Sequence, residues 1–274
     1  QISRTRILFP SFDLFPTAQA THVANEALLA MHCRWIGSED SRYPRRMLSD
    51  LTPNPPVLFY LGDLSLLDRH PTVGIIGTKS PSRAGASIAR SLGRALAESG
   101  WMIVSGLARG CDQAGHRGAL EVGGATVAFI PQGMLTLEMP PLLREFATLD
   151  NFLIISTWPP DAPWSGSLAV RRDVQIADTS DGVIAVEMNI RGGGTKYTVD
   201  FARERSRPVW TVQYPRVPRQ AAGNPWLIQT GAQPIMIDEN NQITPPSLRT
   251  LITQLKKAST QAKKRMRVMQ MEMF

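Results

Sequence analysis

The sequence is poor in cysteine and has no long apolar run. Cys33 and Cys111 are its two cysteines, which are too few for a disulfide framework, and neither has a neighbour at the spacing of a zinc site. No uninterrupted apolar run approaches the ~18–20 residues that a membrane-spanning helix needs, and the first ten residues lack the apolar core of a secretory signal. We therefore expect reduced thiols, no metal site, no membrane association and a cytoplasmic location.

The sequence also lacks the common nucleotide-binding motifs. Gly74 and Gly77 are three residues apart and no Gly-Lys-[Ser/Thr] follows them, so their loop is not a Walker A motif. It is not a G-x-G-x-x-G loop either, and no acidic residue ends the next apolar run, as one does in dinucleotide-binding proteins. Asp112 and His116 could share a helix face, but without a nucleophile or metal ligands a hydrogen bond at the helix start explains them better. We therefore expect no catalytic residue and no cofactor.

The chain carries a surplus of positive charge, because 30 lysines and arginines outnumber 23 acids and give a net charge of +7. This surplus favours a polyanionic partner such as nucleic acid, although it could equally serve solubility alone. A hydrophobic content of 43% is ordinary for a globular protein. At 274 residues, we expect one large domain with a smaller appendage.

Three short apolar runs, Val73–Ile76, Trp101–Val104 and Ala125–Ile130, are separated by two segments of helical length and period. This strand–helix–strand–helix–strand pattern predicts an α/β fold with a parallel sheet flanked by helices. Further strands are predicted over Val57–Leu61, Phe152–Ser156, Gly182–Glu187 and Pro208–Gln213. Helices are predicted over Ser82–Ser99, Asp112–Glu121, Pro140–Phe146, Val170–Asp178 and Tyr197–Arg205.

The pattern divides the chain into three regions. Residues 1–42 are expected to form a small helical appendage with a helix over Thr21–Trp35, and residues 43–240 form the main α/β domain. Residues 241–274 form a short basic tail, with one or two helices from Pro246. The positive charge of this tail comes from Lys256, Lys257, Lys263, Lys264, Arg265 and Arg267.

Four glycine- or serine-bearing turns fall where predicted strands end: Gly77-Thr78-Lys79, Ser105-Gly106, Gln132-Gly133 and Gly192–Lys196. In parallel sheets ligands bind at this edge, where glycine allows close backbone approach and helix N-termini attract anions. The alternative is that these are ordinary tight turns with a solvated basic rim. The cations in or beside the turns are Lys79, Arg83, Arg109, Arg171, Arg172, Arg191 and Lys196.

These turns predict a binding site for phosphate groups or nucleic acid. Glu187 ends a strand beside the glycine loop and could contact a ribose, act as a base or anchor the loop. Trp158 and Trp164 flank a proline-rich loop near the arginines, where they could stack on bases or pack the loop down. The predicted phosphate contacts are Gly77, Thr78, Lys79, Ser82, Arg83, Ser105, Gly106, Arg109, Gln132, Gly133, Arg171, Arg172, Gly193, Gly194, Thr195 and Lys196.

Taken in order, several segments resemble the DNA-processing protein A (DprA/Smf) family. They are G-I-I-G-T-K-S-P-S-R-A-G from Gly74, I-V-S-G-L-A-R-G-C-D-Q-A-G-H-R-G-A-L from Ile103, P-P-V-L-F-Y-L-G-D-L-S-L-L, the later glycine loop, and P-W-L-I-Q-T-G-A. The resemblance extends over roughly Tyr43 to Ala232. It implies an extended Rossmann-like sheet in a protein that binds single-stranded DNA, forms a homodimer and helps load a recombinase during DNA uptake. Members of the family have no established catalytic activity.

The sequence departs from the family pattern at several positions. Lys79 stands where the family usually has arginine, Asp173 where it has asparagine, and Gly193-Gly194-Thr195 where it has Ser-Gly-Ser. The tail is too short for the winged-helix domain that many members carry. The chain therefore resembles a divergent member, for which a setting in phage defence or as the antitoxin that neutralises a toxin is an alternative to transformation.

Three hypotheses follow. The first is a non-catalytic protein that binds single-stranded DNA, with a recombinase or a cognate toxin as a protein partner. The second is a nucleotide sensor or a LOG-type nucleotide phosphoribohydrolase, a related Rossmann-like family with a similar glycine loop; those enzymes need a glutamate where this chain has Thr198. The third is an interaction protein whose partner covers the basic face.

Overall fold

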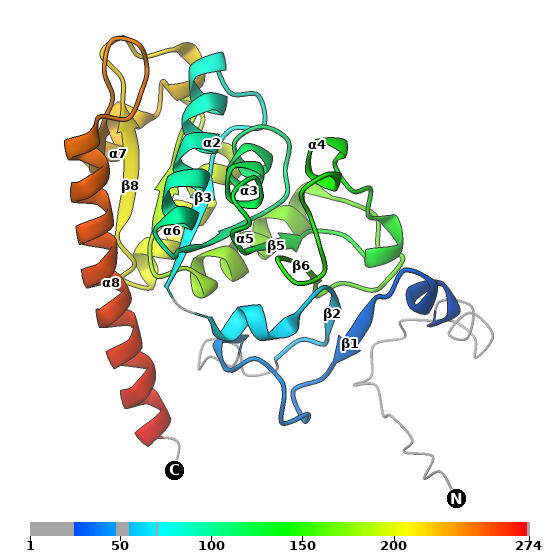
Figure 1. Ribbon diagram of the computed structural model, residues 1–274. Helices are drawn as coiled ribbons and strands as arrows, with labels where there is room; N and C mark the ends of the chain where they lie inside the picture. Colours follow the sequence, from blue (N-terminus) through cyan, green and yellow to red (C-terminus); the bar gives the residue numbers. More distant parts are fainter. Residues whose placement is uncertain (1–24, 48–54, 70, 273–274) are drawn as a thin grey trace, which may run out of the picture.

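The computed structural model describes residues 25–47, 55–69 and 71–272 (Figure 1). Within these residues nine strands form one sheet in the order β1-β2-β6-β5-β4-β3-β7-β8-β9. The strands are β1 (Arg34–Ile36), β2 (Leu58–Leu61), β3 (Thr72–Ile76), β4 (Met102–Ser105), β5 (Thr126–Ile130), β6 (Phe152–Ser156), β7 (Val183–Ala185), β8 (Val209–Gln213) and β9 (Gln233–Met236).

Helices cover both faces of the sheet. On one face, α2 (Arg83–Glu98), α3 (Cys111–Leu120) and α8 (Pro245–Glu272) pack on the strands. On the other face lie α5 (Gly166–Thr179), α6 (Gly193–Glu204) and α7 (Asn224–Gln229) (Figure 1). The short α4 (Pro141–Arg144) follows β5, and 3₁₀ turns occupy Arg45–Met47, Leu64–Asp68, Met134–Thr136 and Arg219–Ala221.

The predicted Rossmann-like α/β fold is confirmed, with one difference at an edge of the sheet. The strands from β6 to β9 are parallel to one another, but β1 and β2 pair antiparallel, and β2 pairs antiparallel with β6. Antiparallel pairing needs no crossover helix between neighbours. The short strands that precede the parallel core can therefore extend the sheet beyond β6.

The helix predicted over Thr21–Trp35 ends earlier than expected. Residues 25–30 are helical, residues 21–24 lie outside the described part of the chain, and the strand β1 already begins at Arg34. The chain reverses at His32, which has a φ of 57°, and the amide of Cys33 donates to the carbonyl of Leu28 over 2.8 Å. The apolar residues of the helix, the turn and the strand together happen to have a helical spacing. The strand has three residues and is too short to show a pattern of its own.

Two glycines allow α2 and α3 to pack closely. A Cβ atom at Gly118 would lie 1.9 Å from the carbonyl oxygen of Arg90, and one at Gly93 would lie 2.1 Å from that of Gly115. The backbones of the two helices are therefore in direct contact. This contact fixes α3, whose N-terminus follows the turn after β4.

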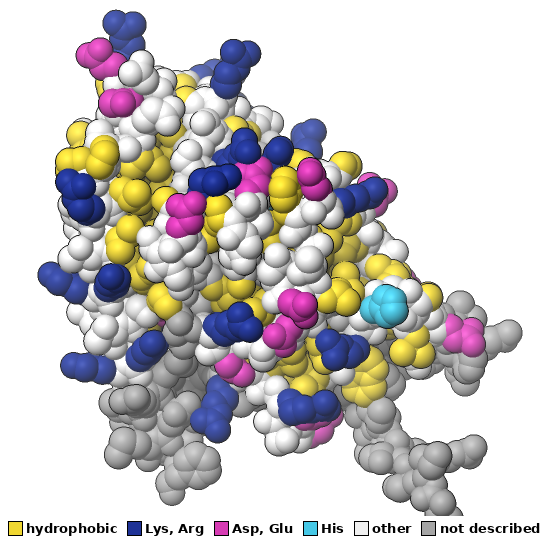
Figure 2. Space-filling view, in the orientation of Figure 1, with side chains coloured by type: hydrophobic (Ala, Val, Ile, Leu, Met, Phe, Trp, Pro, Cys, Tyr) yellow, Lys and Arg dark blue, Asp and Glu magenta, His cyan; other side chains and the backbone are white. Residues whose placement is uncertain are grey.

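The tail is a single helix, α8, which packs against the sheet. Leu251 and Leu255 are buried with Val212 of β8 and Ile235 of β9, and the indole of Trp210 donates to Gln254 over 2.8 Å. Figure 2 shows lysine and arginine side chains along this edge of the molecule. In the described residues no helix is long and apolar enough to cross a bilayer.

Candidate nucleic-acid interface

The turns that follow β3, β4, β5 and β7 meet at the carboxyl-terminal edge of the parallel strands. The amide of Thr78, after β3, donates to the carbonyl of Glu187, after β7, over 2.8 Å. Arg172 of α5 donates to the carbonyls of Gly106, after β4, and Phe129, at the end of β5. The four predicted turns therefore lie at one edge, as the parallel topology requires.

A pocket of about 310 Å³ opens among three of these turns. Lys79 comes from the first turn, Arg109 from the loop after the second and Gln132 from the third, while Trp164 comes from the loop before α5. The glycine turn Gly192–Lys196 does not contribute to the lining and lies beside the pocket. The lining residues are Lys79, Gly106, Leu107, Ala108, Arg109, Gln113, Ile130, Pro131, Gln132, Leu137, Glu138, Pro140, Trp164, Ala169 and Arg172.

Two cations of this region lie over exposed or half-buried indole rings. The ammonium of Lys79 is 4.6 Å from the centroid of the Trp164 ring, and the guanidinium of Arg171 is 5.1 Å from that of Trp158. The side chain of Trp164 is 53% exposed, so one molecule can reach both the indole face and the ammonium. An aromatic face beside a cation suits a nucleotide, which presents a base for stacking and a phosphate for pairing.

Arg172 is not an exposed phosphate contact, which corrects the prediction. It is 5% exposed, and besides the two carbonyls its guanidinium donates to Asp173 over 3.1 Å. It therefore connects the ends of β4 and β5 and adds positive charge to the wall of the pocket. Consecutive helical residues point about 100° apart, so Arg171 is exposed while Arg172 is buried.

Two buried carboxyl groups accompany Arg172. Burial raises the pKa of Asp112 to about 7 and that of Asp173 to about 6, and the positive charge of Arg172 opposes both shifts. Asp112 also accepts hydrogen bonds from the backbone of Gly106 and Ala108. One guanidinium and two carboxyl groups thus form a buried charge cluster directly beneath the turn after β4.

His116 has a structural role apart from this cluster. It is fully buried, burial lowers its pKa to about 3, and its Nδ1 lies 2.7 Å from the hydroxyl of Thr126. That hydroxyl donates to the carbonyl of Ile103, so Nδ1 carries the proton and donates. At the start of α3, Asp112 accepts hydrogen bonds from the preceding loop. His116 takes no part in them and connects α3 to β5, so the predicted helix-start bond involves Asp112 alone.

Glu187 anchors a loop, the simplest of the alternatives that the sequence left open. It is fully buried, and its carboxylate accepts from the amide of Ser82 over 2.8 Å, the Ser82 hydroxyl over 2.6 Å and the Tyr214 hydroxyl over 3.0 Å. A Cβ at Gly85 would lie 2.2 Å from its carboxyl carbon. The structure contradicts a ribose contact for Glu187 and leaves neither donor of Ser82 for phosphate.

Ser105 is a further correction. Its side chain is fully buried, and its hydroxyl donates to the carbonyl of Ile75 over 2.6 Å. The hydroxyl therefore connects β4 to β3 and does not face the pocket. Among the other predicted contacts, Gly106, Gly133 and Thr195 are buried, and Gly77, Thr78 and Gln132 are half-buried.

The glycine turn before α6 is exposed but carries a nearby acid. Gly192 and Gly193 have φ angles of 77° and 61°, which glycine adopts at little cost, and Gly193 and Gly194 are exposed. A Cβ at Gly194 would lie 3.6 Å from a carboxylate oxygen of Asp173. The α6 N-terminus attracts anions, but an ionised Asp173 would repel them.

Five predicted cations remain accessible for contact with a polyanion. None of them forms an ion pair with another described residue, whereas Lys196 pairs with Asp200 over 2.5 Å. Only two of the five line the pocket, so the others extend the basic surface around it. The five exposed cations are Lys79, Arg83, Arg109, Arg171 and Arg191.

Leu107 is a pocket residue that the sequence did not single out. It lines the pocket and has a φ of 59°, which costs energy in a residue other than glycine. Its position between Gly106 and Ala108 carried no side-chain signal. Glu138, Gln113 and Leu137 are further lining residues outside the predicted set.

A family model and curated relatives match most of this chain. The model of the family described as DNA recombination-mediator protein A matches residues 34–244. The chain is 34% identical to protein Smf of Synechocystis, over 76% of this chain and 52% of that protein. It is 32% identical to the DNA processing protein DprA of Bacillus subtilis, over 75% of this chain and 69% of that protein. The chain thus spans between about half and two thirds of the length of these curated relatives.

Solved structures show the same fold. DNA processing protein A from Streptococcus pneumoniae superposes with a TM-score of 0.65 at 29% identity, covering 78% of this chain and 74% of that one. DNA processing protein A from Helicobacter pylori, whose structure was described for its single-stranded DNA binding mode, gives a TM-score of 0.65 at 26% identity, covering 82% and 98%.

Proposed function

Because the chain belongs to the DNA recombination-mediator protein A family, we propose that it binds single-stranded DNA in the pocket beside Lys79, Arg109 and Trp164. It does so without catalysis and acts in DNA processing or recombination. The observation that carries this proposal is the Lys79–Trp164 pair at the mouth of a basic pocket. The Helicobacter pylori relative, described as a single-stranded DNA binder, supports it.

Different side chains of the pocket bind the base and the phosphates. A base that stacks on Trp164 takes the place of the Lys79 ammonium on the indole, and the displaced ammonium then pairs with a neighbouring phosphate. Arg109 is exposed at the same pocket and can pair with a second phosphate. Arg172, held by carbonyls, keeps a fixed positive charge behind them.

A salt titration with a fluorescent oligonucleotide tests this function. Stacking is worth about 1–3 kcal/mol per base, so Trp164→Ala should weaken single-strand affinity about 5- to 150-fold. Lys79→Ala with Arg109→Ala should lower the slope of log affinity against log salt by about 1.4, because each phosphate contact on a single strand contributes about 0.7.

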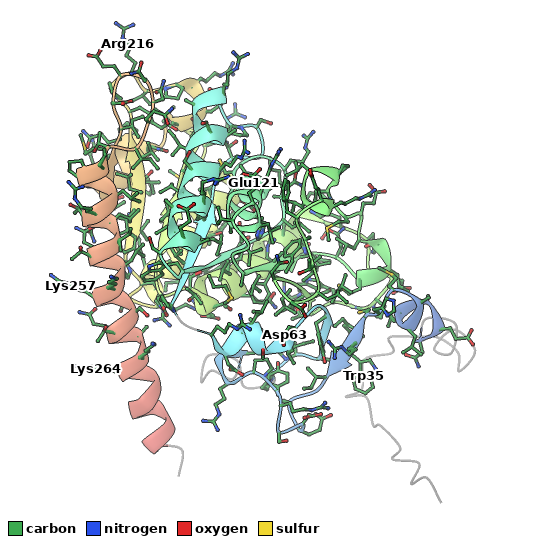
Figure 3. The ribbon with its side chains drawn as sticks, in the orientation of Figure 1. Trp35, Asp63, Glu121, Arg216, Lys257 and Lys264 are labelled. Atoms are coloured by element: carbon green, nitrogen blue, oxygen red, sulfur yellow. The ribbon has the colours of Figure 1, made fainter. Side chains whose placement is uncertain are left out.

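Arg216→Ala is the matched control, because Arg216 is an exposed cation on the loop after β8 (labelled in Figure 3) and does not line the pocket. It should leave the affinity within about twofold. Equal losses in the pocket and control variants, or no binding to the wild-type protein at low salt, would refute the proposed function.

A nucleotide phosphoribohydrolase activity has less support. Glu187 is enclosed by protein donors, and Thr198 stands where those enzymes have glutamate. Incubation with nucleoside monophosphates, followed by chromatography, should yield no free base. Release of base that Glu187→Gln abolishes would reverse the ranking of the two functions.

The protein partners and the cellular setting are part of the proposal. A homodimer, a recombinase and a cognate toxin are the proposed partners, with phage defence and toxin neutralisation as settings beside recombination. Purification of the tagged chain from its own cells, with and without nuclease, should recover a recombinase or a toxin that persists after nuclease treatment.

A further inference from the structure

The helix α8 has one buried face and one strongly basic face. Leu251, Leu255, Ala258 and Ala262 are buried, and their spacing of four, three and four residues places them along one side of the helix. Figure 1 shows α8 along the edge of the sheet, beside β8. The helix is therefore held by its apolar side, and the opposite side is presented to solvent.

The five cations of α8 between Pro245 and Lys264 lie on this outer side. They recur at intervals of seven residues, or about 10.5 Å along the helix, so they form two neighbouring rows. One row is Arg249, Lys256 and Lys263, and the other contains Lys257 and Lys264. All five are exposed, and Figure 3 labels Lys257 and Lys264 on this helix.

No acidic residue balances this charge over the stretch Pro245–Lys264 of α8. From Pro245 to Lys264 the helix contains five cations and no aspartate or glutamate, and none of the five forms an ion pair with another described residue. On α2, in contrast, Arg90 and Arg94 are both paired with Glu121. A helix face that serves only solubility usually mixes both signs, so a row of one sign indicates an anionic partner.

We propose that the basic face of α8 binds the phosphate backbone of duplex DNA. Duplex DNA carries one negative charge per about 1.7 Å of its axis, and lysine binds phosphate as a point charge. The stretch from Pro245 to Lys264 has no aromatic side chain, so it has nothing on which unpaired bases can stack. The face contacts the backbone and does not read the base sequence.

A lipid surface fits this helix less well. Helices that lie in a membrane interface bury an apolar face among the lipids. The apolar side of α8 already packs on β8 and β9 through Leu251 and Leu255. The exposed face therefore offers charge without the apolar area that would hold it in a bilayer.

The basic face of α8 and the pocket are separate sites. The pocket lies at the turns after β3, β4 and β5, whereas α8 covers β8 and β9. From the pocket strands β3, β4 and β5 to β8 and β9 there are two to five strand spacings in the sheet order, or about 10–24 Å. Duplex binding by α8 does not depend on the pocket, and one molecule can hold a duplex and an adjoining single strand together.

Fluorescence anisotropy of the full chain tests the proposal, with a blunt 20-base-pair duplex and a single-stranded oligonucleotide as separate probes. The variant is Lys256→Gln, Lys257→Gln, Lys263→Gln and Lys264→Gln combined, which keeps good helix formers. It should lower duplex affinity at least 10-fold at low salt. The salt slope should fall by up to about 3.6, or about 0.9 per contact, while single-strand affinity changes less than twofold.

Two controls separate this site from the pocket. Replacing the same four lysines by arginine should preserve duplex binding, and Trp164→Ala should weaken the single strand but not the duplex. The proposal is overturned if the wild-type protein does not bind the duplex at low salt, or if the glutamine variant binds it equally well. It is also overturned if the four glutamines abolish binding to vesicles of anionic phospholipid and leave duplex binding intact.

Discussion

At the scale of single residues, the charges around the pocket have unequal roles. Lys79 and Arg109 are exposed and can move to a ligand, whereas Arg172 is fixed by two carbonyls and a carboxylate. Removing a partner from a buried charge is costly. The cluster of Arg172, Asp112 and Asp173 therefore matters first for stability and for the shape of the turns.

The raised pKa of Asp112 predicts a pH-dependent stability. Its folded-state pKa of about 7 lies above the ordinary aspartate value of 3.8, so the folded state binds an extra proton between these two pH values. Its contribution to stability is present below about pH 4 and is lost as the pH rises through about 7. Asp173, with a pKa raised to about 6, acts in the same direction.

Chemical denaturation of the wild-type protein and Asp112→Asn at several pH values measures this effect. The unfolding free energy of the wild type, relative to the variant, should fall between pH 4 and 8, by on the order of a few kcal/mol at most. Taking the difference cancels the other titrating groups. A difference that is constant with pH would show that Asp112 is ionised throughout the range.

At the scale of elements, the helices α2 and α3 pack with their backbones in direct contact. A Cβ at Gly118 would overlap the backbone of Arg90 at 1.9 Å, and a backbone atom cannot turn aside as a side chain can. Since α3 begins at the turn after β4, a shift of this helix would also displace Arg109 and the pocket wall.

Gly118→Ala should therefore lower the free energy of unfolding by about 1–3 kcal/mol, the usual cost of overpacking. Gly166→Ala is the control, because a Cβ at that position of α5 has no atom within 4 Å. It should be neutral or raise stability by up to about 1 kcal/mol. Urea titrations of both variants give the comparison, and equal stabilities would mean that the two helices separate readily.

The elements themselves were largely predictable, for a physical reason. The central strands are buried on both faces and appear in the sequence as continuous apolar runs; the strand predicted over Phe152–Ser156 has those bounds, and the Trp101–Val104 prediction differs from β4 by one residue at each end. The antiparallel β1 was missed because three residues show no periodicity. The tail was predicted as one or two helices. The structure has the single helix α8, whose apolar side includes the buried Leu251 and Leu255.

The site was predictable at the level of turns and less so at the level of atoms. Glycine, serine and the cations at strand ends indicated where the four turns would meet. Burial could not be seen in them, because a charge or hydroxyl appears the same in a sequence whether it faces solvent or a carbonyl. For that reason the sequence did not show that Arg172, Ser105 and Glu187 are buried and support the scaffold.

At the scale of the whole molecule, the structure separates two basic surfaces on one sheet, and the proposed homodimer would double both. Size-exclusion chromatography with light scattering should give a mass of about twice the 30.2 kDa of the chain. The mass should be independent of salt if apolar contacts hold the dimer, since screening weakens only charge pairs. A monomer at micromolar concentration would contradict the dimer. The DNA-binding proposals would be unaffected, because their tests do not depend on dimerisation.

The short outer strands of the sheet restrict how such copies can meet. At one edge β1 has three residues, and at the other β9 has four, one of them Pro234, which has no amide proton to donate. Short strands and proline discourage edge-to-edge pairing between proteins. We therefore expect a second copy to associate through side chains on helices and loops and not by extending the nine-stranded sheet.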